Sequence, residues 1–194
     1  MSHKILYFDT ETTGLNPVTC GLIQFSCIIE VDGKPLSKGN MHIAPFDTDL
    51  IEPSALAING YSVETIKSFE PPLAAHHRLV KSLSRYVDQF NPTDKFFIAG
   101  YNVGFDLDFL ASWFKKCGDN YLGSYINWIK IDPLPFLHHM HFTGKLNLPN
   151  YKLATVCKHY DIPLTAHDAM SDIEATRTLI VDKLKLTTIS HQNS

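Results

Sequence analysis

The chain has 194 residues, of which 44% are hydrophobic and 19% are charged, and its formal net charge is −3. This length suits one domain with a sizeable core, and the slight acidic excess excludes a protein that coats nucleic acid through a broad basic surface. Four widely spaced cysteines without a CxxC pair, and the lack of an apolar run long enough to cross a bilayer, predict a soluble, cytoplasmic protein with reduced thiols.

The first half of the chain predicts three antiparallel strands followed by helices. Residues 4–11 are apolar on both alternating faces, which is typical of a central strand covered on both sides. Residues 22–31 predict a second strand, and Asp32-Gly33 is a hairpin signal that leads into a third strand ending at MHIAP. Short helices are expected in SALAINGYSVETI, with an interruption at Asn59-Gly60.

The second half predicts strands that alternate with helices. LVKSLSRYVDQF carries apolar residues at helical spacing from Leu79 to Phe90, and Asn91-Pro92 is expected to stop that helix. FFIAGYN and WIKID predict two further strands, separated by a helix from about Phe105 to Cys117. The remaining expected helices are 133–142, 151–160 and 168–185, the first of them with Asp132 as its cap and Pro133 at its first position.

This order of elements predicts an α/β protein of the ribonuclease-H-like fold. We expect a central mixed five-stranded sheet, with three antiparallel strands and then parallel strands, flanked by helices. Residues 1–185 are expected to form a single domain, and residues 186–194 a short polar C-terminal tail.

Two acids stand near the end of the first strand, where large apolar residues surround them. Asp9 and Glu11 share one face of the strand because side chains repeat every two residues. Burying two carboxylates costs several kcal/mol unless they are paired or bind a metal.

In the helix that follows FFIAGYN, Asp106 falls in line with the apolar stripe, whereas Asp108 falls on the solvated side. By itself, Asp106 is better explained as a residue that supports the helix N-terminus than as a catalytic residue.

The C-terminal region adds a fourth acid and a histidine. Asp172 lies in line with Thr176 beside the packed face of the last helix, and His167 precedes it by five residues. Alone, each is an ordinary surface or structural residue. Together, four oxygen-donor side chains converging on a sheet suit hard octahedral cations such as Mg²⁺ or Mn²⁺.

Three motifs carry a resemblance to a known family. FDTETTG, NVGFD (Asn102 to Asp106) and HDAMSD (His167 to Asp172) resemble, in order and spacing, the three motifs of the DEDDh 3′–5′ exonuclease family. That family includes the proofreading epsilon subunit of bacterial DNA polymerase III, ribonuclease T and oligoribonuclease. The likeness runs from residue 4 to about residue 185 and extends to LIQFS, ALAINGYS and KLATVCKHYDI.

The resemblance implies a chemistry. Asp9, Glu11, Asp106 and Asp172 would hold two divalent metal ions, Mg²⁺ or Mn²⁺, and His167 would take the proton of the attacking water as general base. The products would be nucleoside 5′-monophosphates released from single-stranded or frayed 3′ ends. DTETTG is closer to the DNA-acting members than to oligoribonucleases, so DNA is favoured over RNA as substrate.

The same resemblance suggests substrate contacts around the acids. Backbone groups of Thr12 and Thr13 would bind the terminal 3′-hydroxyl, and Gly14 would allow close approach. Leu15 would wedge against the terminal bases, although a core leucine after a turn explains it equally well. The two further candidates are Asn102, which would position substrate or cap its helix, and Phe105, which would stack on a splayed base.

Several alternatives stay open at this level. They are an RNA-trimming exoribonuclease of the same family, a non-catalytic polymerase-associated binding module, and a metal-dependent hydrolase of small phosphoesters. The expected partner is the 3′ end of a nucleic acid and not a membrane, with a polymerase or replication complex as a second candidate. Homodimerisation and a bacterial or phage source are both compatible with the sequence.

Overall fold

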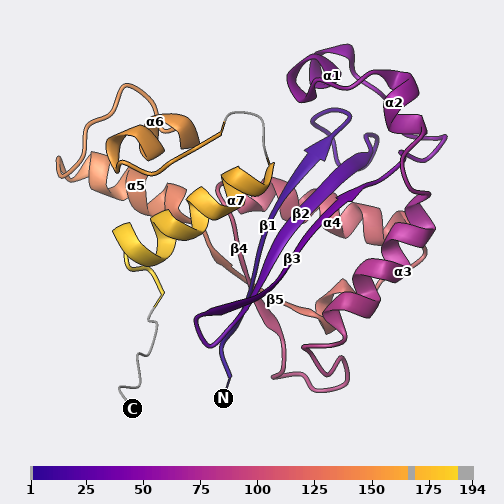
Figure 1. Ribbon diagram of the computed structural model, residues 1–194, viewed down its shortest axis with the longest axis horizontal. Coiled ribbons are helices and arrows are strands. Elements are labelled where there is room, and N and C mark those ends of the chain that lie inside the picture. Colours follow the sequence, from indigo (N-terminus) through magenta and orange to yellow (C-terminus); the bar gives the residue numbers. More distant parts are fainter. Residues whose placement is uncertain (1, 166–168, 188–194) are drawn as a thin grey trace.

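A mixed sheet of five strands forms the centre of the computed structural model, which describes residues 2–165 and 169–187 (Figure 1). The strands are β1 (Lys4–Thr12), β2 (Leu22–Val31), β3 (Lys34–His42), β4 (Phe96–Ala99) and β5 (Ile126–Ile131). Their order is β3-β2-β1-β4-β5; β1, β2 and β3 are antiparallel neighbours, and β4 and β5 continue the sheet in parallel. The predicted ribonuclease-H-like α/β fold is therefore confirmed.

The turn between β2 and β3 forms as its sequence indicates. Asp32 and Gly33 both have positive φ, at 50° and 78°. Two central residues with positive φ are the mark of the tight hairpin turns whose twist matches that of the strands, and Asp-Gly favours this conformation. The hairpin sets the register in which Ser26 of β2 lies opposite Asn40 of β3.

Seven α-helices surround the sheet in the described part of the chain. They are α1 (Pro53–Asn59), α2 (Val63–Lys67), α3 (Pro72–Leu83), α4 (Val103–Lys116), α5 (Pro133–Phe142), α6 (Leu153–His159) and α7 (Ala169–Thr178). A 3₁₀ turn spans Leu122–Ser124, and a π-helical turn, Leu179–Lys183, continues α7. The predicted break between α1 and α2 is present, because Gly60 ends α1 in the left-handed conformation at φ 73°.

The helix predicted from Leu79 to Phe90 was placed wrongly. Helix α3 begins at Pro72 and ends at Leu83. Beyond that point the Asp88 carboxylate accepts a hydrogen bond from the Phe90 N–H at 3.0 Å, and Phe90 is 86% exposed. A short polar side chain that bonds the local backbone competes with the helix, so the apolar spacing of residues 79–90 overstated the helix. Strand β5 also starts at Ile126, two residues before the predicted WIKID strand.

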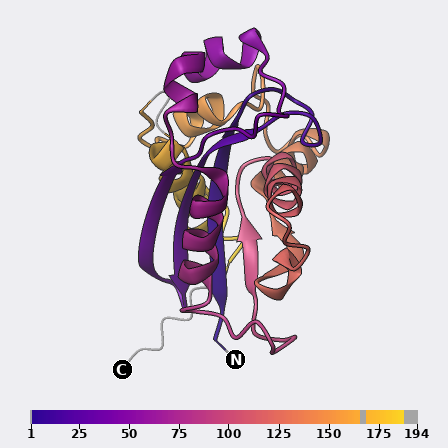
Figure 2. The same ribbon diagram turned by 90° about the vertical axis from the view of Figure 1, so that its right-hand side faces the viewer.

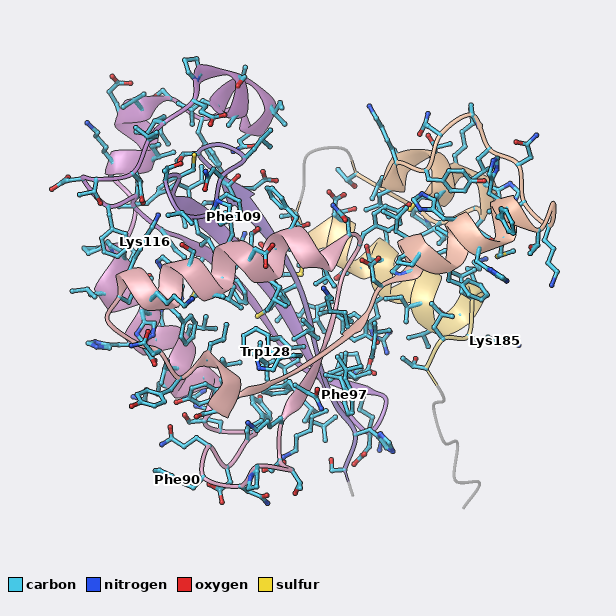
Figure 3. The ribbon with its side chains drawn as sticks, turned by 180° about the vertical axis from the view of Figure 1, so that it is seen from behind. Phe90, Phe97, Phe109, Lys116, Trp128 and Lys185 are labelled. Carbon is cyan, nitrogen blue, oxygen red and sulfur yellow. The ribbon has the colours of Figure 1, made fainter. Side chains whose placement is uncertain are left out.

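The two faces of the sheet are covered by different helices. The even-numbered residues Leu6 and Phe8 of β1 pack with α3 and α4, whereas Ile5 and Tyr7 pack with Ile173 of α7. In Figure 1, α7 lies in front of the sheet and α4 lies behind it; Figure 2 shows the same arrangement after a quarter turn. Figure 3 shows from behind how α4, with Phe109 and Lys116, crosses the rear face. The face that carries Asp9 and Glu11 is therefore the face beneath α7.

Helix α7 is held to the sheet by two ion pairs. Arg177 donates to Glu30 of β2 at 2.6 Å through Nε and at 2.5 Å through Nη2, and Glu30 is only 2% exposed. On the exposed side, Lys38 of β3 pairs with Glu174. Because α7 carries Asp172, these pairs fix the orientation of that acid above β1.

Two features of chain organisation complete the fold. None of the described helices is long and apolar enough to cross a membrane. The division into a domain of residues 1–185 and a polar tail of residues 186–194 stays a prediction, and Leu186 packs against the cluster under α7.

Candidate active site

Asp9 and Glu11 stand where β1 outruns its parallel neighbour. Strand β4 pairs with β1 only from Ile5 to Tyr7, while β2 follows β1 to its end. Beyond Tyr7, the edge of β1 that faces β4 has no described strand beside it, so the ends of helices can approach it. In α/β sheets, ligands bind at the carboxyl ends of strands for this reason.

Helix α4 brings Asp106 to that open edge. Asp106 lies in the first turn, and its Oδ1 accepts hydrogen bonds from the Thr10 backbone N–H at 2.9 Å and from the Thr10 hydroxyl at 2.8 Å. The prediction that Asp106 faces inward is confirmed, since it is 5% exposed, and Asp108 is exposed as expected. Thr10, which the sequence reasoning passed over, is therefore the link between the two acid-bearing elements. Its position between the two acids was the available signal.

Helix α7 adds Asp172 to the same place. A cavity of about 10 Å³ between β1, β4 and α7 is lined by Asp9 and Asp172, together with Gly100 and Tyr101. A space of this size holds about one water molecule. Asp9 and Asp172 therefore face a common space. His167 lies outside the described residues, so its predicted role stays a prediction.

The electrostatics show how closely these acids interact. Burial raises the pKa of Asp9 well above its ordinary value, and the charges of Asp106, Glu11 and Asp172 raise it further. Burial, together with the Asp172 charge, also raises the pKa of Glu11. Burial raises the pKa of Asp106 from 3.8 to about 7, although the two bonds from Thr10 act in the opposite direction. The structure thus brings the four predicted acids into one mutually repelling cluster.

The pKa values of Asp9, Glu11 and Asp106 show no influence of a cationic side chain among the described residues. Within residues 2–165 and 169–187, burial, hydrogen bonds and the neighbouring acids account for the pKa shifts of these three groups, and no lysine, arginine or histidine contributes. Four carboxylates are the ligand type of hard divalent cations, so the donor chemistry fits such ions. Within residues 2–165 and 169–187, however, no group of three or more His, Cys, Asp or Glu side chains is arranged to hold a metal ion as it stands. Like charges repel, so a bound cation would have to draw these side chains together.

The loop after Glu11 is a tightly bonded turn. The Thr13 backbone N–H donates to Gly21 at 2.9 Å, its carbonyl accepts from Glu52 at 2.8 Å, and its hydroxyl donates to Leu50. A Cβ at Gly14 would lie 2.5 Å from the Cys20 sulfur, so this position leaves no room for a side chain. Thr13 is fully buried. The predicted contact of its backbone with substrate is not supported, because both backbone groups are already engaged in holding the loop.

Thr12 precedes and Leu15 follows the buried residues Thr13 and Gly14 in this loop. The Thr12 hydroxyl donates to the Gly14 carbonyl at 2.7 Å, and its own carbonyl accepts from Asn59 Nδ2 at 2.8 Å. Leu15 is 77% exposed. The alternative that Leu15 is a core residue is wrong, which leaves its side chain available in the loop that follows Glu11.

Asn102 and Phe105 frame the start of α4. Asn102 occupies the N-cap position with a left-handed φ of 58°, but its side chain makes no capping bond; the simple capping role expected of it is therefore wrong. Its backbone N–H donates instead to Asp132 at 3.1 Å, and Asp132 caps α5 as predicted, accepting from Leu134 at 3.0 Å. Phe105 is half-buried and its ring centroid lies 5.0 Å from that of the core residue Phe109.

Comparison with known proteins decides the family. The family described as Exonuclease (RNase_T) matches residues 6–180. The chain belongs to the DEDD family of 3′–5′ exonucleases. The match spans Asp9, Glu11, Asp106 and Asp172, the four acids that the fold brings together.

Relatives of this exonuclease-family chain fall into two groups. It is 26% identical over 181 residues to the PolC-type DNA polymerase III of Halalkalibacterium halodurans. The match covers 93% of the chain and 11% of the polymerase. It is 29% identical over 193 residues to ribonuclease T of Actinobacillus pleuropneumoniae serotype 5b, covering 91% of the chain and 83% of that enzyme. The chain thus spans about a tenth of the polymerase relatives and most of the ribonuclease T relatives.

Solved structures support the fold. Exonuclease I of E. coli in complex with a dT13 oligonucleotide superposes with a TM-score of 0.75 at 23% identity, over 93% of this chain and 41% of that one. A zinc-bound form of the E. coli Exonuclease I complex with single-stranded DNA gives a TM-score of 0.76 at 22% identity, over 96% of this chain and 42% of that one. At this level of identity, the likeness establishes the shared architecture.

Proposed function

We propose that this chain hydrolyses the terminal phosphodiester at the 3′ end of single-stranded or frayed DNA and releases nucleoside 5′-monophosphates, as a DEDDh-type exonuclease. The observation that carries the proposal is the cluster of Asp9, Glu11, Asp106 and Asp172 at the end of β1, in which the charges of the other three acids raise the pKa of the buried Asp9. Such a cluster is costly to the fold unless a ligand compensates its charge. Binding of divalent cations at the substrate phosphate supplies that compensation.

Asp9, Glu11, Asp106 and Asp172 would hold two ions, either Mg²⁺ or Mn²⁺. When bound, the ions supply Lewis-acid activation of water and neutralise charge on the departing oxygen. The protein supplies orientation: the two bonds from Thr10 fix the Asp106 carboxylate, and the ion pair of Arg177 with Glu30 fixes the helix that carries Asp172. His167 would accept the proton of the attacking water, a role that suits histidine because an unperturbed imidazole changes its charge near neutral pH.

The rim of the cluster would receive the terminal nucleotide. Leu15 offers an exposed apolar side chain against which a base can pack. The hydroxyl and carbonyl of Thr12 and both backbone groups of Thr13 are engaged in the loop, so we assign the contact to the 3′-hydroxyl to neither residue. Asn102 and Phe105 stand at the start of α4, in the same turn as Asp106.

A second candidate is trimming of RNA 3′ ends. It is favoured by the ribonuclease T relatives, which the chain matches over 80% and 83% of their length. The PolC-type relatives favour DNA and, as a further proposal, association with a polymerase. Both candidates use the same acids, so they differ in substrate and not in mechanism.

The test is digestion of end-labelled DNA and RNA, single- and double-stranded, with Mg²⁺ or Mn²⁺ and with EDTA as the metal-free control. We expect mononucleotides from the 3′ end of single-stranded DNA, no products in EDTA, and protection by a 3′-phosphate. Circular single-stranded DNA is the matched substrate without an end. Efficient cleavage of the circle would reveal an endonuclease and overturn the proposal, and preferential digestion of RNA would favour the second candidate.

A further inference from the structure

A chain of polar side chains extends from the acid cluster across the face of β2 and β3. In the sheet register, Asp9 lies opposite Ser26, which lies opposite Asn40; in the next row, Glu11 lies opposite Gln24, which lies opposite His42. Because the register is direct, all six side chains project from one face of the sheet. A sheet face beneath packed helices is normally apolar, so this polar strip requires an explanation.

The strip is a connected hydrogen-bond network. The Tyr61 hydroxyl, which lies 3.1 Å from His42 Nε2, donates to Gln24 Oε1 at 3.0 Å. The Gln24 side-chain amide donates in turn to Asn40 Oδ1 at 2.9 Å. The Ser26 hydroxyl donates to the same Asn40 oxygen at 3.0 Å. Ser26 is fully buried and Gln24 nearly so, and a satisfied buried network is rigid.

The network ends at an exposed donor. Two hydrogen bonds converge on Asn40 Oδ1, which fixes the amide plane and leaves the NH₂ group pointing away from them. Asn40 is exposed, and no described residue accepts a hydrogen bond from that NH₂ group. The result is a preorganised donor whose direction is set by buried partners.

The position of this donor relates it to the acids. Strands lie about 4.8 Å apart, so two steps from β1 to β3 place Asn40 roughly 10 Å from Asp9, within reach of the nucleotide that precedes the terminal one. Helix α7 packs on β1 and β2, and Figure 1 shows no helix in front of β3.

We propose that the platform of Gln24, Ser26 and Asn40 binds the sugar–phosphate backbone of the nucleotide next to the 3′-terminal one, with the Asn40 NH₂ group donating to it. Asparagine amides are common partners of nucleic-acid phosphates. The inference rests on the proposed exonuclease function and adds a second binding position to it. Asn40 acts on substrate affinity and register, while the acid cluster carries the reaction.

The decisive variant is Asn40→Asp, because it keeps the acceptor oxygen for Gln24 and Ser26 and replaces only the donor by a negative oxygen. Asn120→Ala, at an exposed asparagine in the loop after α4, serves as the control for surface substitution. Kinetics are measured on an oligo-dT pentamer and on the p-nitrophenyl ester of thymidine 5′-monophosphate, which has no second nucleotide. Loss of one hydrogen bond to a charged group predicts a rise of about tenfold or more in KM for the pentamer, with kcat unchanged and no effect on the ester.

The proposal that the platform binds substrate is overturned if KM for the pentamer is equal in wild type and Asn40→Asp. It is also overturned if the substitution raises KM equally for the pentamer and for the ester. Binding of a fluorescein-labelled pentamer, followed by anisotropy with Ca²⁺ in place of Mg²⁺, tests the platform without turnover. We expect about tenfold weaker binding in Asn40→Asp; binding that is equal in the two proteins, including no binding in either, counts against the platform. Failure of the wild type to hydrolyse either substrate would instead refute the proposed function.

Discussion

Neutralising Asp106 should stabilise the metal-free protein and flatten its dependence on pH. Burial raises the pKa of Asp106 from 3.8 to about 7 in the folded protein. A group whose folded pKa is raised contributes stability at pH values below its unfolded pKa, and that contribution is lost as pH rises through the folded pKa. Metal-free wild type should therefore lose stability between about pH 4 and pH 8.

The expected size follows from the shift. At about 1.4 kcal/mol per pH unit, the portion of the shift between pH 5.5 and pH 7 is worth roughly 2 kcal/mol. For a domain of this size, this corresponds to about 4–8 °C in the unfolding midpoint. Asp106→Asn keeps an oxygen that can accept from Thr10 and removes the charge, so it should be more stable than wild type at pH 8 by up to about 4 kcal/mol.

The assay is thermal unfolding in EDTA at pH 5.5 and pH 8, followed by circular dichroism. Asp108→Asn is the matched control, since Asp108 is exposed two residues farther along the same helix. Mg²⁺ added at pH 8 should raise the midpoint of wild type more than that of Asp106→Asn. Parallel pH curves for wild type and Asp106→Asn would show that the buried carboxylate is not under electrostatic strain, and the reasoning about the cluster would fail.

Three other predictions address the cluster and the helix above it. Asp9→Asn should remain folded and lose metal-dependent release of mononucleotides, as assayed by gel; turnover near wild type would contradict a metal-binding role. His167→Ala should lower the rate about 10²–10⁴-fold and abolish the rise of rate with pH through the histidine titration, so an unchanged pH profile would remove His167 from the mechanism. Arg177→Met should cost about 3 kcal/mol in urea unfolding because it leaves Glu30 buried and unpaired. Lys38→Met, which breaks the exposed ion pair on the same helix, should cost less than about 1 kcal/mol. Equal losses of unfolding free energy in the two variants would refute the distinction between a buried and an exposed ion pair.

Much of the acid cluster was predictable from the sequence because it depends on local periodicity. A strand repeats every two residues and a helix every 3.6, so Asp9 with Glu11, and Asp106 with the apolar stripe of its helix, were assigned to faces without knowledge of the fold. The Asp32-Gly33 turn was predictable for the same reason, since its conformation is set by two residues. Order along the chain then sufficed for the sheet topology.

Contacts between distant segments decided the rest. Residues such as Gly21 and Leu50 meet the loop after Glu11 only in the folded chain. They decide whether the Thr13 backbone is available to substrate, and only the folded chain shows that Leu15 lies on the surface. The early end of α3 reflects polar side chains that compete with the helix for the backbone beyond Leu83. The bond from Thr10 to Asp106 joins residues 96 positions apart, and the orientation of Asn40 depends on side chains from two strands. Sequence periodicity specifies which face a side chain occupies, but the partner on that face is specified only when strands and helices pack, because packing brings together groups that the chain keeps far apart.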